Sequence, residues 1–213
     1  GGGRTPGRPQ GVPLHIQLTV IARLMHTPFF FLTLVYILTG LGAGLVIPYF
    51  NIFFVLHLHT SSALFGLIDG GANATTALLT LLAPWLAVRI GRIRTIALMR
   101  LLSIPLFLTI GLSGNLLLAA LLYPFRQGIM DMSNGVLQVY SMEVVEERHR
   151  GLANSAYQAA FQVPWAITAS LGGLLIAHLG YTPLFLITAS CYMLAIAVLW
   201  GRFGYPRLEY KKQ

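Results

Sequence analysis

The sequence predicts an all-α membrane protein with six transmembrane helices, and three observations support this fold class. First, only 9% of the 213 residues are charged, compared with about 25% in a typical soluble domain. Second, hydrophobic residues make up 56% of the chain and are gathered in long runs, as expected when lipid is the solvent. Third, nearly all Lys and Arg residues fall in alternate connections between these runs, a pattern typical of polytopic membrane proteins.

The segment before the first helix, residues 1–27, is predicted to be a linker. Residues 1–13 are rich in Gly, Pro and Arg, which is typical of flexible linkers. Residues 14–26 mix apolar and polar side chains and fit either a short amphipathic helix in the headgroup region or a frayed extension of the first span. The chain starts with three glycines and no initiator Met, so we expect a fragment that begins inside a loop of a longer protein.

Six apolar runs follow, each in the length range that crosses a bilayer. The first begins at Thr27-Pro28, an N-cap followed by proline at the first helical position. Turn and breaker residues set the other boundaries. The predicted spans are residues 28–56, 62–88, 95–112, 115–141, 152–177 and 181–201. Together, residues 28–203 are expected to form one transmembrane domain, followed by a short tail over residues 204–213.

The positions of Lys and Arg predict the orientation in the membrane. Basic residues lie before the first span, between spans two and three, between spans four and five, and in the tail, whereas the other connections contain none. Arg100, just inside the third span, is expected to snorkel to the same side. Because the positive side is cytoplasmic, both termini and the tail are predicted to be cytoplasmic, in a multi-pass protein of the plasma membrane or cell inner membrane.

Composition and motifs argue against several other classes. A net charge of +8 would suggest a nucleic-acid partner for a soluble protein, but here the basic residues stand in connections without interleaved aromatics, so no nucleic-acid partner is expected. Cys191 is the single cysteine, and His57 and His59 have no acidic ligand nearby, so no metal site is expected. No HExxH, GxSxG, P-loop or GxGxxG motif occurs, and neither enzyme activity nor a cofactor is predicted.

The fourth span carries the polar residues that best indicate a function. Four of them recur at i, i+4, i+7 and i+11 and form one stripe on a helix: Gln127, Asp131, Asn134 and Gln138. Arg126 lies at the flank of the stripe. A charge at the bilayer centre costs about 3 kcal/mol or more, and a polar stripe must face protein or water. We interpret the stripe as the wall of a water-filled cavity that presents Arg126 and Asp131 to a solute; the alternative is that its amides bond neighbouring helices.

The second span contributes Asp69 and, one turn later, Asn73. Asp69 lies at a depth near that of Arg126, so an ion pair between them is one interpretation. The other is that Asp69 or Asp131 carries a coupling proton. Glycines spaced four apart, Gly40 with Gly44 and Gly66 with Gly70, mark expected close helix contacts, although the same spacing would also suit hinges.

Several connections resemble motifs of the major facilitator superfamily of secondary transporters. Residues 86–94, Leu-Ala-Val-Arg-Ile-Gly-Arg-Ile-Arg, are similar to its signature loop, roughly Gly-x-Leu-Ala-Asp-Arg-x-Gly-Arg-Arg. The sequence departs from this pattern at Val88, where the family usually has Asp, and at Pro84, which replaces the leading Gly. Residues 126–128, Arg-Gln-Gly, resemble a shortened form of the family's Arg-x-x-x-Gly helix motif. Residues 141–151 resemble the end of the family's fourth or tenth helix and the start of the next.

The resemblance implies that the chain is the carboxy-terminal half of such a transporter, with the amino-terminal six-helix half of the same protein as its partner. In the family each lobe consists of two inverted three-helix repeats, whose first helices line the central cavity. By the same resemblance, residues at the cytoplasmic ends of the spans, most of them charged, form a gate latch: Arg89, Gly91, Arg92, Glu143, Glu146 and Arg150. The alternative is that these charges set the topology and form solvated surface pairs.

The function predicted from these features is transport of a small solute across the bilayer by alternating access, coupled to an ion such as a proton. Two alternatives are a non-transporting six-span membrane module and a membrane-embedded enzyme that uses Asp69 and Asp131. An anionic solute, a sugar and an amphiphilic drug are all compatible with a polar cavity wall that carries one arginine.

Overall fold

The computed structural model describes residues 27–204, and within this range every regular element is helical. The predicted linker and tail therefore lie outside the described residues, apart from Thr27 and Gly204. The long helices are α2 (Pro28–Val46), α4 (Ser62–Ile90), α5 (Arg92–Leu112), α6 (Leu116–Glu143), α7 (Arg150–Leu179) and α8 (Tyr181–Phe203). Four short elements join them: η1 (Ile47–Tyr49), α3 (Phe50–Ile52), η2 (Phe53–His57) and η3 (Glu147–His149). The six predicted spans correspond to the six long helices, which confirms the fold class.

Polar side chains begin several helices where the sequence predicts a start. The Thr27 hydroxyl accepts a hydrogen bond from the Phe30 amide at 3.4 Å, and Pro28 follows the cap, as predicted. Asn115 caps α6 in the same way, through the Leu118 amide at 3.1 Å. The first span is less regular than expected. The predicted helix over residues 28–56 is interrupted after Val46, beside Pro48, and continues as the 3₁₀, α and π turns of η1, α3 and η2.

Within the described residues, five segments are long and apolar enough to cross a membrane. They are Pro28–His57, Ser62–Ile90, Arg92–Leu112, Glu147–Leu179 and Tyr181–Phe203. The remaining long helix, α6, has 28 residues, about 42 Å at 1.5 Å per residue, so its length is sufficient to cross a bilayer. It is the helix that carries the polar stripe, and its composition is less apolar than that of the others. A helix of this kind must be shielded from lipid by its neighbours.

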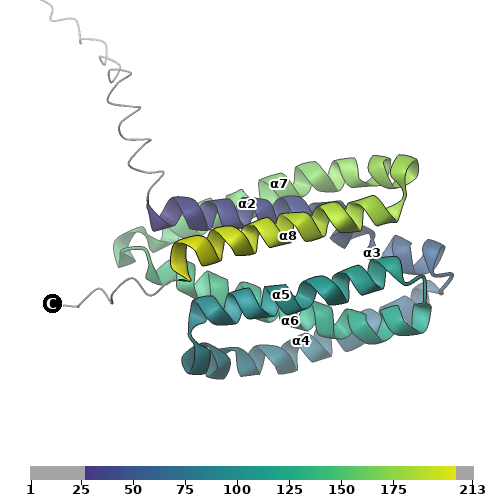
Figure 1. Ribbon diagram of the computed structural model, residues 1–213, viewed down its shortest axis with the longest axis horizontal. Helices are drawn as coiled ribbons and strands as arrows, with labels where there is room; N and C mark the ends of the chain where they lie inside the picture. Colours follow the sequence, from purple (N-terminus) through teal and green to yellow (C-terminus); the bar gives the residue numbers. More distant parts are fainter. Residues whose placement is uncertain (1–26, 205–213) are drawn as a thin grey trace, which may run out of the picture.

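The packing of the helices has an internal symmetry (Figure 1). Helix α2 packs against α7 and α8, α6 packs against α4 and α5, and α5 packs against α8. This set of contacts is unchanged when each helix of the first three is exchanged for its counterpart in the last three: α2 with α6, α4 with α7, and α5 with α8. The lobe therefore consists of two three-helix repeats, and each repeat places its first helix against helices of the other. The predicted pair of inverted repeats is confirmed.

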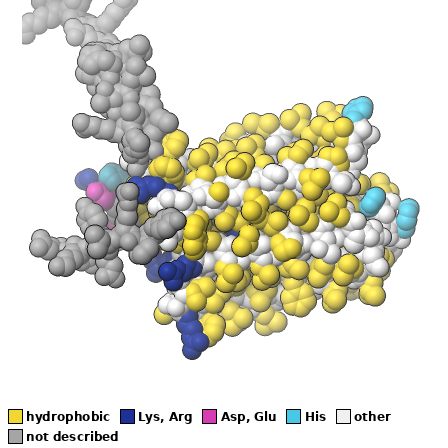
Figure 2. All heavy atoms as spheres, in the orientation of Figure 1, with side chains coloured by type: hydrophobic (Ala, Val, Ile, Leu, Met, Phe, Trp, Pro, Cys, Tyr) yellow, Lys and Arg dark blue, Asp and Glu magenta, His cyan; other side chains and the backbone are white. Residues whose placement is uncertain are grey.

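Charged side chains gather at one end of the bundle. Helix α2 begins and α8 ends at this same end (Figure 1), where Figure 2 shows Lys, Arg, Asp and Glu side chains together. The sides of the bundle in that view are largely hydrophobic, and the opposite end shows His side chains but no Lys, Arg, Asp or Glu among the described residues in this view. An apolar belt between two polar ends is the surface expected of a protein that spans a bilayer.

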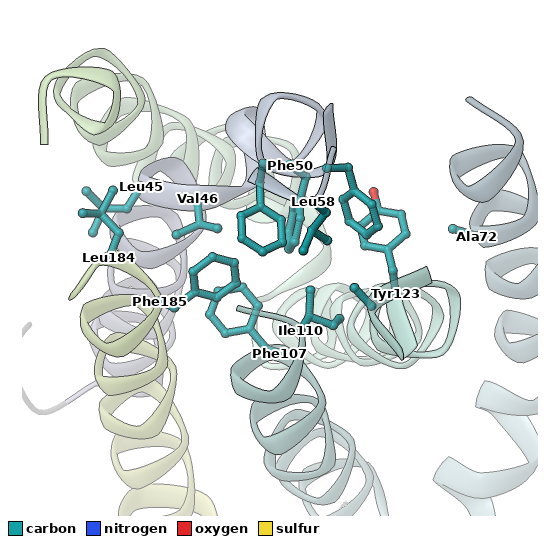
Figure 3. Close-up of a cluster of buried hydrophobic side chains, with 13 residues drawn as sticks. Leu45, Val46, Phe50, Leu58, Ala72, Phe107, Ile110, Tyr123, Leu184 and Phe185 are labelled. Atoms are coloured by element: carbon teal, nitrogen blue, oxygen red, sulfur yellow. The ribbon is translucent and has the colours of Figure 1, made fainter. Parts of the chain in front are cut away.

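Aromatic side chains close the bundle at the end opposite the charges. Phe50 lies between the rings of Phe107 and Phe185 on one side and Tyr123 on the other (Figure 3). Its ring centroid is 5.1 Å from that of Tyr123 and 6.2 Å from that of Phe107. All four side chains are buried. Because offset and edge-to-face rings stabilise one another beyond their buried area, this cluster fixes the break after α2 against α5, α6 and α8.

Glycines allow α2 to approach α7 closely. A Cβ added at Gly40 would meet the backbone carbonyl of Phe161, and one added at Gly44 would meet the carbonyl of Trp165. The prediction of a close contact is therefore confirmed for this pair. Gly66 and Gly70 form no such contact within this lobe, because no described atom lies within 4 Å of a Cβ at either position. The spacing of small residues identifies a candidate contact surface, but the topology decides which helix uses one.

Candidate functional site

Two adjoining cavities, each of about 350 Å³, run along the polar side of α6. Their size is in the range of small-molecule sites. We name them the Arg100 cavity and the Arg126 cavity after the arginine that lines each one. Four residues line both cavities: Thr39, Asp131, Asn134 and Phe161. Helices α2, α6 and α7 therefore form a common wall, and the two cavities together make one polar groove.

All the polar residues predicted for α6 line this groove. Gln127 faces the Arg126 cavity, Gln138 faces the Arg100 cavity, and Asp131 and Asn134 face both. The i, i+4, i+7, i+11 spacing places them along one side of the helix, as predicted from the sequence. Gln158 of α7 faces the same groove from across the Arg100 cavity. The amides of α6 thus contact open space as well as neighbouring helices.

Arg126 is almost completely buried, with 5% of its surface exposed. It donates one hydrogen bond within residues 27–204, from Nη2 to the Tyr192 hydroxyl at 3.4 Å. Its guanidinium lies over the rings of Phe107 and Phe50, at 5.0 and 5.8 Å from their centroids. Its Nε is buried and has no hydrogen-bond partner among these residues. The charge is therefore stabilised by aromatic faces, one hydroxyl and the electrostatic attraction of Asp131, which lines the same cavity without a hydrogen bond to the guanidinium.

The predicted ion pair between Asp69 and Arg126 is not formed, although both residues line the Arg126 cavity. Asp69 instead accepts a hydrogen bond from the Tyr123 hydroxyl at 2.9 Å and one from the Asn73 amide at 3.4 Å. Asn73 in turn accepts a hydrogen bond from Gln127 at 3.4 Å. The phenol of Tyr123, one turn before Arg126 on α6, is thus the group that contacts the Asp69 carboxylate.

Arg100 does not snorkel to the charged end, so that prediction is wrong. It lies eight residues into α5, about 12 Å from the start of the helix, and only 2% of its surface is exposed. Its guanidinium donates to the hydroxyls of Ser133 and Thr39, at 3.2 and 2.9 Å, and to the side-chain oxygen of Asn134 at 3.0 Å. Arg100 therefore joins α5 to both α2 and α6, and it lines the cavity that bears its name.

The charged end of the bundle contains most of the predicted gate residues. Arg92, at the start of α5, forms an ion pair with Glu143, at the end of α6. Each helix end is unfavourable for the charge it carries, because a helix start repels cations and a helix end repels anions, so the pair offsets both effects. Between α4 and α5, Gly91 adopts a φ of 89°, which favours glycine. This glycine sets the turn that presents Arg92.

The other predicted gate residues have separate partners. Arg150 Nε donates to the Met142 carbonyl at 3.0 Å, and Glu146 contacts Arg148 Nε at 3.1 Å. The Arg89 guanidinium lies over the Trp85 ring, 4.8 Å from its centroid. Among the described residues, no group of three His, Cys, Asp or Glu side chains is arranged to hold a metal ion.

Comparison with known proteins identifies the family. Residues 32–213 match the family described as the Major Facilitator Superfamily. The chain belongs to this superfamily. The packing of α2 against α7 and of α6 against α4 is thus that of a major facilitator lobe.

A solved structure shares the fold of this major facilitator lobe. It is the crystal structure of a bacterial homologue of the iron transporter ferroportin in an outward-facing state, with a TM-score of 0.67 and 21% sequence identity. The similarity covers 85% of this chain and 46% of the homologue, so the chain spans about half the length of that protein. No curated protein matches the chain.

Several residues of the groove were missed at the level of sequence. Arg100 was assigned to the membrane surface, although its depth of two turns in α5 was a signal for burial. Tyr36, Thr39 and Tyr192 line the groove but belong to apolar helices and carry no periodic polar pattern. Only their positions in the folded lobe bring them to α6.

Proposed function

We propose that the chain is the carboxy-terminal lobe of a secondary transporter that moves a small solute across the plasma membrane by alternating access. The observation that supports this most is the polar groove of two adjoining cavities along α6. In this proposal the amino-terminal six-helix half of the same protein covers the open side of the groove. In this proposal the charged end, where α2 begins and α8 ends, faces the cytoplasm because basic residues are retained there.

Asp131 is our candidate for the group that couples transport to an ion. It lines both cavities and, among residues 27–204, it forms no hydrogen bond or ion pair. Asp69 is the second candidate, but its carboxylate already accepts hydrogen bonds from Tyr123 and Asn73. A carboxylate at the groove between the two arginines is placed to bind a proton in one state of the transport cycle and release it in another.

Alternating access is tested by cysteine labelling, which does not require the solute to be known. Gln127→Cys is introduced into the full-length protein in a background without other cysteines. In sealed vesicles, a membrane-impermeant maleimide is then applied from either side. We expect labelling from both sides, because the groove opens to each in turn. Asp131→Asn is expected to remove any change in labelling caused by an imposed pH gradient.

The matched control is Leu102→Cys, whose side chain is exposed on α5, in the segment that spans the membrane, and faces away from the groove. It is expected to stay unlabelled from both sides because a charged reagent does not enter lipid. Labelling of Gln127→Cys from one side only would favour a non-transporting module or a membrane-embedded enzyme over a transporter.

We further propose that the Arg92–Glu143 pair helps to hold the cytoplasmic gate closed. The two side chains are 44% and 41% exposed, so the pair contributes under about 1 kcal/mol. Arg92→Glu is therefore expected to raise the rate of cytoplasmic labelling at Gln138→Cys by no more than about fivefold. The reversed pair, Arg92→Glu with Glu143→Arg, is expected to restore most of the original rate. If the two substitutions have additive effects instead, the pair only sets topology.

A further inference from the structure

Two buried guanidinium groups face the groove without a carboxylate hydrogen-bonded to them. Arg100 and Arg126 are 2% and 5% exposed, and neither forms an ion pair with a described residue. Leaving a buried charge without a counter-charge is among the costliest arrangements in a protein, and more so in a membrane. Both arginines line a cavity, so a counter-ion has room to reach them.

The two arginines differ in how fully their hydrogen bonds are used. Arg100 donates to three neutral acceptors, which fixes its orientation but does not neutralise its charge. Arg126 donates only the 3.4 Å bond to Tyr192, and its buried Nε has no partner. A guanidinium has five N–H donors in a planar fork. Arg126 therefore retains most of its capacity to bind an oxyanion.

The acidic residues of the groove do not use the hydrogen-bond donors of the two arginines. Asp69 lines the Arg126 cavity and accepts hydrogen bonds from Tyr123 and Asn73. Asp131 lies between the two cavities and is the one other carboxylate that lines the groove. Two carboxylates and two guanidinium groups thus line the groove. Among the described residues neither carboxylate accepts a hydrogen bond from a guanidinium, so the donors of Arg126 stay open to a ligand.

Aromatic side chains supply the second feature that a ligand would use. Phe161 lines both cavities, and Trp165 and Tyr123 line the Arg126 cavity beside the guanidinium. An inorganic ion would gain little from these rings, whereas the apolar part of an organic ion would bury surface against them. The wall combines a cationic group with an apolar surface at small-molecule size.

We propose that the solute is a small organic anion, whose carboxylate or phosphate group binds Arg126 while its apolar part packs against Phe161 and Trp165. Arg100 acts as a positioning residue, since it holds the side chains of Thr39 and Asn134 at the groove and adds a second positive charge. That the bound anion is a transported solute rests on the proposed function. The binding of the anion itself does not depend on transport.

Binding is tested on the purified full-length protein by the shift in its Tm with four probes of similar shape. Benzoate and phenyl phosphate carry the two oxyanion groups, benzamide is neutral, and benzylammonium is a cation. A ligand that binds the folded state raises Tm according to its concentration and Kd. We expect a rise of a few degrees with at least one anion and none with benzamide or benzylammonium. The anion that gives the larger rise identifies the preferred group.

The substitution Arg126→Gln is expected to weaken anion binding about 10- to 100-fold, because hydrogen bonds to charged groups contribute about 1.5–3 kcal/mol. Arg94→Gln, at an exposed arginine in the first turn of α5, is the matched control and should bind as before. If Arg126→Gln does not fold, protection of Gln127→Cys from maleimide replaces it, and benzoate or phenyl phosphate should protect where benzamide does not.

Three results would overturn the inference: no stabilisation by either anion, equal stabilisation by benzamide or benzylammonium, or undiminished anion binding in Arg126→Gln. The failure of this inference is distinguishable from that of the proposed function. Anion binding without labelling from both sides would contradict the proposed transport function and support the anion-binding site. Labelling from both sides without anion-specific binding would support the transport function and contradict the proposal that the solute is an organic anion.

Discussion

Replacement of Arg126 by alanine is expected to reduce transport by the full-length protein at least about 100-fold, while the protein still inserts into the membrane. The substitution removes the guanidinium that faces the Arg126 cavity. Two charge-assisted hydrogen bonds from this group to the proposed anionic solute would be lost, which corresponds to about 3 kcal/mol or more. Insertion should be preserved, because removal of a charge from a spanning helix lowers the cost of placing it in lipid. Solute uptake into vesicles measures the first effect, and the amount of protein in the membrane measures the second.

The control for this prediction is Arg94→Ala, which removes an arginine from the exposed first turn of α5 and should leave uptake within about twofold. A loss of transport together with a loss of inserted protein would point to a structural role for Arg126. Unchanged uptake would assign Arg126 to packing against Phe107 and Phe50.

The substitution Gly44→Ala is expected to destabilise the lobe, although it adds only one methyl group to α2. The new Cβ would meet the Trp165 carbonyl and the Thr168 side chain, and a backbone carbonyl cannot move aside without separating α2 from α7. Overpacking of this kind costs about 1–3 kcal/mol. The measurement is the Tm of the purified full-length protein, together with its yield from membranes.

Gly70→Ala provides the matched comparison, since it adds the same methyl group to a helical glycine with no atom within 4 Å of the new Cβ. Alanine favours a helix over glycine by about 1 kcal/mol, so Tm should stay the same or rise. Equal losses in both variants would mean that backbone flexibility, rather than close packing, is what these glycines provide.

The sequence predicts the helices of this lobe well because their signals are local. An N-cap at Thr27 or Asn115 acts on amides three residues away, and the polar stripe of α6 depends only on the period of a helix. The break after Val46 lies beside Pro48, so it has a local signal in the sequence. The packing around it is not local, because the aromatic cluster at Phe50 draws its members from four separate segments.

The partners of the buried charges could not be predicted in this way. Arg100 meets Thr39, 61 residues earlier in the chain, and Ser133, 33 residues later. Whether such a residue snorkels or is buried depends on which polar groups the fold brings beside it. Likewise, the Asp69 carboxylate meets Tyr123 rather than Arg126, a choice between two residues of one helix that differ by one turn.

The exchange of helices between the two repeats has a consequence for biosynthesis. Among the described long helices, α2 is made before the others, yet the helices that cover it, α7 and α8, are made after them. During translation α2 must therefore wait in the bilayer, with the glycine surface at Gly40 and Gly44 against lipid or another partner, until the chain beyond Arg150 has been inserted. Helices α4, α5 and α6 can assemble with one another in the meantime. The order in which these helices are synthesised therefore differs from the order in which they can pack against one another.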